Sequence, residues 1–288
     1  MHSKLWRGWV RLLLAMILWT TLGATAEPVT LTLDHGLVAR AEYRKGAADK
    51  PAVLILHGFL QTHAYPLVHN LTDALASAGY SVLAPTLTLG VTHRKQSLPC
   101  EAIHTHTHED NARELNEWLQ WLSARGHSRI VLIGHSMGSA ELLLYLRTHR
   151  PRAVVHFIAL SLVEAQTDLD SERLQKLRSH LQRKLARGDR GTEVHPLSFC
   201  RRLQGTPQTF LSYYAITPQR VQSAIKSLRI PATFIMGGGD DRLSAGWIER
   251  IRRTGQRVVI IPNASHFLDG EHEFDLIDVV LETLRQVG

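Results

Sequence analysis

The stretch from Arg129 to Leu144 constrains the fold most, because it places a serine between two glycines. Ile130–Gly134 is apolar and β-branched without alternation, as in a strand buried on both faces. Gly134–Gly138 then follows the pattern G-x-S-x-G, and a helix opening with small residues comes directly after it. A serine at the tip of such a sharp turn has a strained backbone, so its neighbours two residues away must be small. The sequence therefore predicts that Ser136 is presented on a strand–turn–helix, beside the free N–H groups of a helix start.

Strand and helix patterns alternate along the rest of the chain. Helical spacing of apolar residues predicts helices over 67–78, Asp110–Arg125, Ala245–Arg253 and Glu271–Leu284. Strands are expected over Val29–Leu33, Leu37–Tyr43, Ala52–Leu56, Ser81–Ala84 (stopped by Pro85), Ala153–Leu160, Ala232–Met236 and Arg257–Ile261. This alternation predicts an α/β fold, with a mostly parallel, doubly wound sheet covered by helices on both faces. Ligands of such sheets bind at the carboxyl ends of the strands, where Ser136 lies.

The N-terminus has the layout of a secretory signal peptide. Lys4, Arg7 and Arg11 precede an apolar run that is short for a membrane span, and Ala24–Ala26 follows as a small-x-small cleavage site. We therefore expect residues 1–26 to be a signal peptide, residues 27–288 to be the mature domain, and the protein to be periplasmic or secreted.

Charge gives little reason to expect a nucleic-acid partner. Removal of residues 1–26 takes away three basic residues and no acidic one, which lowers the formal net charge of the chain from +7 to +4. Residues 164–230 interrupt the strand–helix alternation and carry twelve Lys or Arg against six Asp or Glu. We interpret this segment as a basic, mainly helical insertion that could make weak contact with a membrane surface.

A serine nucleophile needs a base, and that base needs an orienting group. His266 is the candidate base, because it follows a late strand and lies downstream of both the serine and an acidic loop. The orienting acid is expected in the loop that begins at Gly237. We choose Asp241 over Asp240, because Arg242 and Leu243 should turn the loop into its helix; Glu164 is a more distant alternative.

The order Ser136, Asp241, His266, together with His57–Phe59 after an early strand, resembles the α/β-hydrolase superfamily. The resemblance covers about residues 28–286. It implies an oxyanion hole formed by the backbone N–H groups of Phe59 and Met137. It also implies that the insertion at about 164–230 is a lid.

Two cysteines remain in the mature chain, Cys100 and Cys200. In an exported protein, an even number of cysteines is interpreted first as a disulfide; two free buried thiols are the alternative.

No metal or cofactor is expected. His104, His106 and His108 alternate and could form a metal site, but a polar loop leading into a helix N-cap is the simpler interpretation. Gly237–Gly239 lacks the spacing of a dinucleotide-binding loop, and His272–Glu273 lacks the second histidine of a zincin.

These patterns together predict an exported serine hydrolase that cleaves a small-molecule carboxylic ester through an acyl-enzyme on Ser136. The same machinery would serve an acyltransferase, a thioesterase, a lactonase or an amidase. A catalytically silent binding protein of the same fold is the alternative from another class. The sequence gives no oligomeric state.

Overall fold

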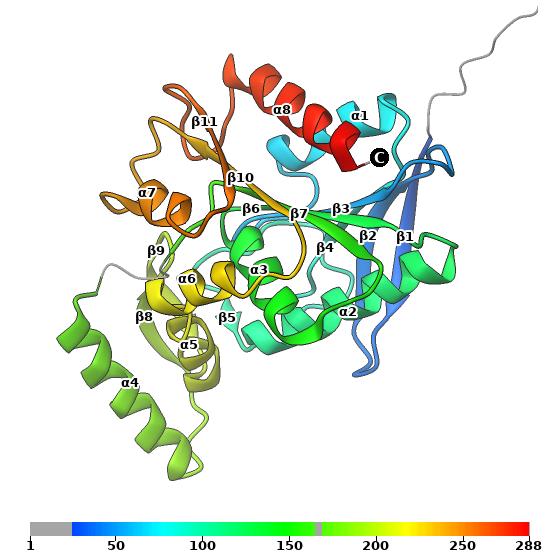
Figure 1. Cartoon of the computed structure of the whole chain (residues 1–288). Helices are drawn as coiled ribbons and strands as arrows, with labels where there is room; N and C mark the ends of the chain where they lie inside the picture. Colours follow the sequence, from blue (N-terminus) through cyan, green and yellow to red (C-terminus); the bar gives the residue numbers. More distant parts are fainter. Residues whose placement is uncertain (1–24, 165–168, 288) are drawn as a thin grey trace, which may run out of the picture.

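An eight-stranded sheet forms the centre of the computed structural model, which describes residues 25–164 and 169–287 (Figure 1). The strand order is β1-β2-β4-β3-β6-β7-β10-β11. β1 and β2 are antiparallel, as are β2 and β4, and every other neighbouring pair is parallel. The predicted α/β class with a mostly parallel sheet is therefore confirmed.

The strands of this sheet are β1 (Ala26–Thr32), β2 (Val38–Arg44), β3 (Ala52–Leu56), β4 (Val82–Thr86), β6 (Ile130–His135), β7 (Val154–Leu160), β10 (Ala232–Gly237) and β11 (Arg257–Ile261). Every residue of β3, β4, β6 and β10 is buried, which explains why these strands are uninterrupted apolar runs rather than alternating ones.

Helices cover both faces of the sheet. α1 (Pro66–Ser77) and α8 (His272–Val287) pack in one apolar cluster, and α2 (His108–Ala124), α3 (Met137–His149) and the short α7 (Trp247–Arg252) pack in the other. Several helices begin where the sequence supplies a capping residue or a proline. In α2, for example, Thr107 and Asp110 form a capping box that satisfies free N–H groups.

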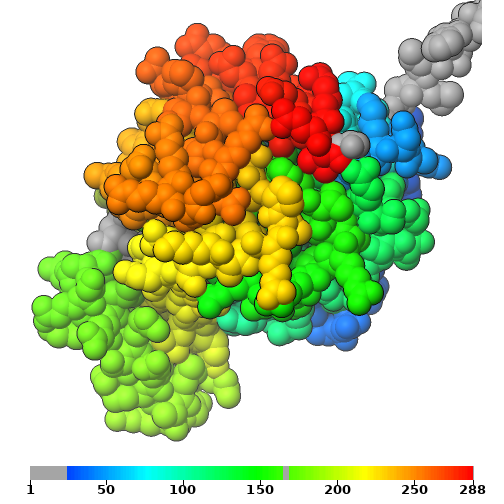
Figure 2. Space-filling model, viewed as in Figure 1, coloured from blue at the N-terminus to red at the C-terminus, as the bar shows by residue number. Residues whose placement is uncertain are grey.

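Residues 169–230, which we call the insertion segment, lie between β7 and β10. The segment contains α4 (Ser171–Ala186), α5 (Pro207–Tyr214) and α6 (Pro218–Lys226). It also contains β8 (Glu193–Leu197) and β9 (Cys200–Gly205), which form a second sheet with β5 (Ile103–His104). α4 buries only Leu181 and extends away from the body of the molecule (Figures 1 and 2). That the insertion segment acts as a lid stays a prediction.

The cysteine pair is bonded. Cys100 and Cys200 form a disulfide that joins β9 to the chain just before β5. The disulfide interpretation is confirmed, and the alternative of two free thiols is wrong.

Two expected elements differ from the structure. The insertion segment is not only helical, because β8 and β9 form a hairpin within it. Pro85 lies inside β4 instead of ending it, opposite Ala41 of β2. The other neighbour, β3, pairs only with Val82 and Leu83, so the missing N–H of the proline breaks no bond to β3.

Most of the predicted signal peptide lies outside the described residues. Thr25 and Ala26 are described, and β1 begins at Ala26. Over the described residues, no helix is both long enough and apolar enough to span a membrane.

Acid should destabilise the fold, because burial, the largest cause in each case, lowers the pKa of several histidines from 6.5 to about 3 or 4: His57, His106, His135 and His156. As the pH falls below 6.5, the unfolded chain takes up protons at these imidazoles while the folded chain does not. Each one therefore removes up to about 1.4 kcal/mol of stability per pH unit. Glu114 opposes part of this loss, since burial raises its pKa to about 7.

We expect the free energy of unfolding, measured by urea denaturation, to fall by at least about 2 kcal/mol between pH 6.5 and pH 5. A His156→Gln variant can still reach Thr233, the partner of His156, and should show a shallower pH dependence. A free energy of unfolding that stays constant or rises over this interval would contradict the prediction.

Candidate active site

The turn between β6 and α3 presents Ser136 as the sequence predicts. Ser136 has φ +55° and ψ −119°, a backbone conformation that non-glycine residues rarely adopt. A Cβ at Gly134 would lie 2.6 Å from the backbone of Gly138, and one at Gly138 would lie 2.4 Å from the carbonyl oxygen of His57. Only glycine fits at either place, so the motif holds helix, turn and β3 in direct backbone contact.

Ser136, His266 and Asp240 form one hydrogen-bonded line. Nε2 of His266 is 2.8 Å from Oγ of Ser136, and Nδ1 of the same ring is 2.8 Å from Oδ2 of Asp240. The side chains of His266 and Asp240 are 3% and 0% exposed, so water hardly competes for the contact between them. The tautomer with a proton on Nδ1 donates to the carboxylate and leaves Nε2 to accept the proton of the serine hydroxyl.

The choice of Asp241 as the orienting acid is wrong, because Asp240 contacts His266 and Asp241 is exposed. The N–H of Gly239 bonds to the carbonyl of Ala264 (2.9 Å), just before His266, so the residue that follows Gly239 faces the imidazole. The expected helix after Arg242 does not begin until Trp247. The more distant alternative, Glu164, forms an ion pair with Arg250 instead.

The two expected oxyanion donors lie beside the serine. Phe59 lines the same cavity as Ser136, and no hydrogen bond from its N–H is found in the described part of the chain. Met137 is the first residue of α3, so its N–H has no acceptor within the helix. Both N–H groups are therefore available to an incoming oxygen, and their role as an oxyanion hole stays a prediction.

Arg94, which the sequence analysis missed, holds the loop that carries Phe59. Its buried guanidinium donates to the carbonyls of Leu60, Gln61, Leu87 and Gln96. Burial lowers its pKa only to about 10, so it stays charged at neutral pH.

His57 completes this support. Its Nδ1–H donates to the carbonyl of Gly58, and Nε2 accepts from the N–H of Leu87. Burial, assisted by Arg94, lowers the pKa of His57 to about 3, which keeps the ring neutral and Nε2 free to accept.

No local sequence signal marks Arg94, because the carbonyls that it contacts are up to 34 residues away.

His135 forms a hydrogen bond to the backbone of His266. Its Nε2–H donates to the carbonyl of His266 at 3.0 Å, and the two rings are 5.3 Å apart. Burial and the nearby His266 lower the pKa of His135 to about 4, so its ring adds no positive charge beside the triad.

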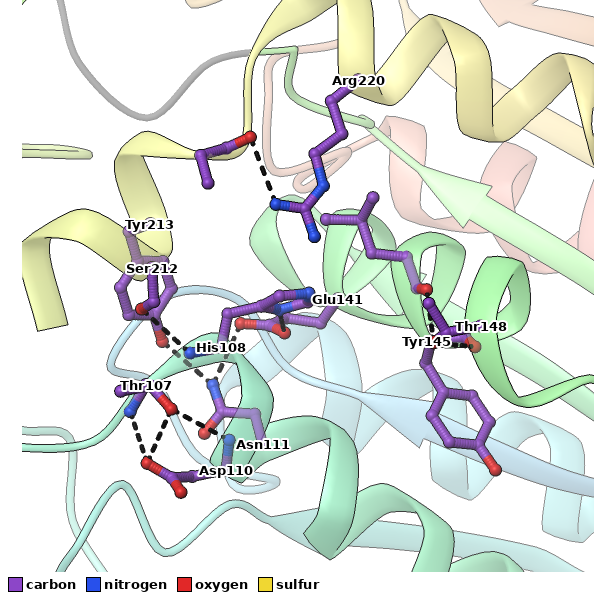
Figure 3. Close-up of polar contacts among 12 residues, drawn as sticks. Thr107, His108, Asp110, Asn111, Glu141, Tyr145, Thr148, Ser212, Tyr213 and Arg220 are labelled. Atoms are coloured by element: carbon purple, nitrogen blue, oxygen red, sulfur yellow. Dashed lines mark hydrogen bonds and ion pairs between the residues drawn. The ribbon is translucent and has the colours of Figure 1, made fainter. Parts of the chain in front are cut away.

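A buried polar network joins α2, α3 and α5 (Figure 3). His108 contacts the carboxylate of Glu141 on α3, and Asn111 donates both to that carboxylate and to the hydroxyl of Tyr213 on α5. The ring of Tyr213 contacts the ring of Phe59, with centroids 5.6 Å apart. The network thus fixes the insertion segment to the helix that follows the serine.

The three alternating histidines do not converge on one common site. His104 and His106 are buried with their rings in contact, whereas His108 pairs with Glu141. In the described residues, one trio, Glu42, His69 and Asp73, has ligand atoms close enough for a metal ion. Both of its carboxylates already bind Arg44.

A cavity of about 260 Å³ opens over Ser136 and His266. Four aromatic side chains line it: Phe59, Tyr65, Phe199 and Phe267. Phe199 belongs to the turn between β8 and β9, so the insertion segment contributes a wall of the cavity. A larger cavity of about 640 Å³ lies between α4 and the α5–α6 turn, and Ser136, Asp240 and His266 do not line it.

Comparison with known protein families identifies the family of this chain. The model of the alpha/beta hydrolase family matches residues 53–278, most of the chain. The chain belongs to the alpha/beta hydrolase family. The resemblance noted from the sequence is confirmed, whereas a search of curated proteins finds no significant match.

Solved structures share the hydrolase fold with low sequence identity. The structure of DcsB in complex with its substrate analogue matches with a TM-score of 0.73 and 14% identity over 92% of this chain and 100% of that one. Est1E from Butyrivibrio proteoclasticus gives 0.64 and 16%, over 90% and 98%. A thermophilic esterase from Thermogutta terrifontis gives 0.61 and 20%, over 91% and 99%. At these identities the likeness shows the fold.

Replacement of the orienting carboxylate should separate the two aspartates. In a triad, an amide at this place favours the wrong histidine tautomer, so Asp240→Asn should slow the reaction of Ser136 with a fluorophosphonate probe by about three to four powers of ten. Asp241→Asn is the matched control and should react within about twofold of the unmodified hydrolase. A larger loss from Asp241→Asn than from Asp240→Asn, measured by gel fluorescence over time, would overturn the assignment.

Proposed function

We propose that this hydrolase cleaves carboxylic esters through an acyl-enzyme on Ser136. The observation that carries the proposal is the 2.8 Å contact between Nε2 of His266 and Oγ of Ser136, with Asp240 behind the ring. A serine hydroxyl becomes a nucleophile when an oriented base takes its proton. The esterases among the structural neighbours agree with this class of reaction.

In the first half of the reaction, His266 takes the hydroxyl proton as Oγ of Ser136 bonds to the ester carbonyl carbon. The electron pair of the carbonyl moves onto its oxygen, and the N–H groups of Phe59 and Met137 stabilise that negative charge. Asp240 stabilises the imidazolium. The carbonyl then re-forms, the bond to the alcohol oxygen breaks, and the imidazolium gives its proton to the departing alcohol.

In the second half, water replaces the alcohol. His266 takes a proton from water as the oxygen attacks the acyl carbon, and the same two N–H groups stabilise the new oxyanion. Collapse of this intermediate breaks the bond to Oγ, which recovers its proton from the imidazolium, and releases the acid. The strained backbone of Ser136 holds Oγ at the cavity wall in both halves.

The cavity favours small acyl groups. Its volume of about 260 Å³ is at the small end of ligand pockets. Its aromatic walls suit the apolar part of a short acyl chain. We therefore propose a preference for short-chain over long-chain esters.

Activity should depend on Ser136 and fall with acyl length. We expect turnover of 4-nitrophenyl acetate and butyrate, measured by release of 4-nitrophenol, with a lower kcat/KM for the palmitate. Ser136→Ala should lose at least about three powers of ten and all labelling by a fluorophosphonate probe.

Ser161→Ala is the matched control, since Ser161 also follows a strand with positive φ but is fully buried. Its rate should stay within about twofold of the unmodified protein. Absence of both labelling and turnover would overturn the proposed function. Turnover of thioesters or amides with inert esters would keep the nucleophile and reject the substrate class.

We propose that the protein acts in the periplasm or outside the cell. The Cys100–Cys200 disulfide supports this proposal, because such bonds persist in oxidising compartments. Expressed with its own N-terminus in a Gram-negative host, the protein should be recovered from the periplasm or medium with a mature chain that begins at Glu27, by mass spectrometry. Ala24→Arg should block this cleavage. Recovery of the uncleaved chain from the cytosol would contradict export.

A further inference from the structure

The cavity over Ser136 carries one full charge, that of Arg242. The cavity wall combines Ser136, His135, His266 and Arg242 with aromatic side chains such as Phe267. Among the residues of this wall, Arg242 is the one Lys, Arg, Asp or Glu, and burial keeps His135 neutral. No acidic side chain lines the cavity, and Asp240 is covered by His266. The wall therefore has a positive charge at Arg242. Burial and, second, the nearby carboxylate of Asp269 raise the pKa of Tyr65 on the same wall.

The guanidinium of Arg242 has no carboxylate partner within the described ranges. It stacks on the ring of Phe267, 4.7 Å from the ring centroid. Asp240 accepts from the backbone N–H of Arg242 and contacts His266, and Asp269 accepts from the hydroxyl of Ser265. Asp241 is exposed, and in the described ranges it forms no ion pair with Arg242. A guanidinium stacked on a ring keeps its N–H donors directed sideways and available.

We propose that Arg242 is a specificity residue that binds a carboxylate of the substrate, and that the preferred esters carry this carboxylate on the acyl group, a few atoms from the scissile carbonyl. The inference rests on the proposed function and adds the charge of the substrate to it. Ser136 and Arg242 line the same small cavity, so an acyl group attached to Oγ can reach the guanidinium. Arg242 is exposed, so solvent and salt weaken the attraction without removing it.

A pair of substrates with one leaving group tests the inference: 4-nitrophenyl butyrate, which is neutral, and mono-4-nitrophenyl glutarate, which carries a carboxylate. The unmodified protein should have the higher kcat/KM for the glutarate. Arg242→Gln should lower the kcat/KM of the glutarate by about fivefold to tenfold and leave the butyrate within about twofold. Any effect of the substitution on the triad would change both substrates equally, so the ratio isolates the carboxylate contact.

Two controls sharpen the ratio. Arg125→Gln removes another exposed arginine that stacks on an aromatic ring, that of Trp121, and should leave the ratio unchanged. Added salt should reduce the preference of the unmodified protein for the glutarate, but not the weaker preference of Arg242→Gln. An unchanged ratio in Arg242→Gln, or equal losses on both substrates, would overturn the inference while turnover of the butyrate still supports the proposed function.

A binding measurement distinguishes a failure of the proposed function from a failure of the carboxylate site. Ser136→Ala protein, titrated with the anilides of the same two acyl groups, should bind the anionic anilide more tightly, and the added substitution Arg242→Gln should abolish the difference. If nothing is hydrolysed or labelled but this difference is present, the proposed function is wrong and the carboxylate site remains. If the two anilides bind alike in the presence of Arg242, the carboxylate site is wrong.

Discussion

The contact between the glycines of the nucleophile turn and the neighbouring backbone is the constraint on which the rest of the site depends. Gly138 packs against the end of β3, and Gly134 packs against Gly138. This contact forces Ser136 into positive φ and directs its side chain above the carboxyl edge of the sheet. The ends of β3 and β6 and the start of α3 therefore fix the serine together. The loop that carries Asp240 is hydrogen-bonded through its backbone to the loop that carries His266, as in the bond from Gly239 to Ala264.

Buried polar groups hold the region around this turn. Arg94 and His57 satisfy carbonyls and an N–H near Phe59, and the His108–Glu141 pair connects α2 to α3. Such groups are costly to bury unless each has its partners, so the contacts specify one arrangement. The rings of His57 and His135, which burial keeps neutral, add no charge near His266, and Asp240 is the carboxylate that contacts it.

Local pattern predicted what depends on local geometry. Ser136 and His266 could be identified because the motif and the strand ends determine where they lie. The choice between Asp240 and Asp241 could not, because it depends on the bond from Gly239 to Ala264, two residues that are distant in the sequence. The roles of Arg94 and Glu141 depend on partners that are tens of residues away. The β8–β9 hairpin was missed because Pro196 and two arginines, Arg201 and Arg202, obscure its alternation.

The disulfide has a consequence for the cavity as well as for stability. Cys200 directly follows Phe199, whose ring contacts Phe59 and forms part of the cavity wall. The covalent bond therefore anchors a wall of the cavity over Ser136 to the chain near Cys100. The shape of this cavity therefore depends on the redox state of the surroundings, because in a chain with reduced thiols hydrogen bonds to the Cys100 segment and side-chain packing hold this wall without the covalent bond.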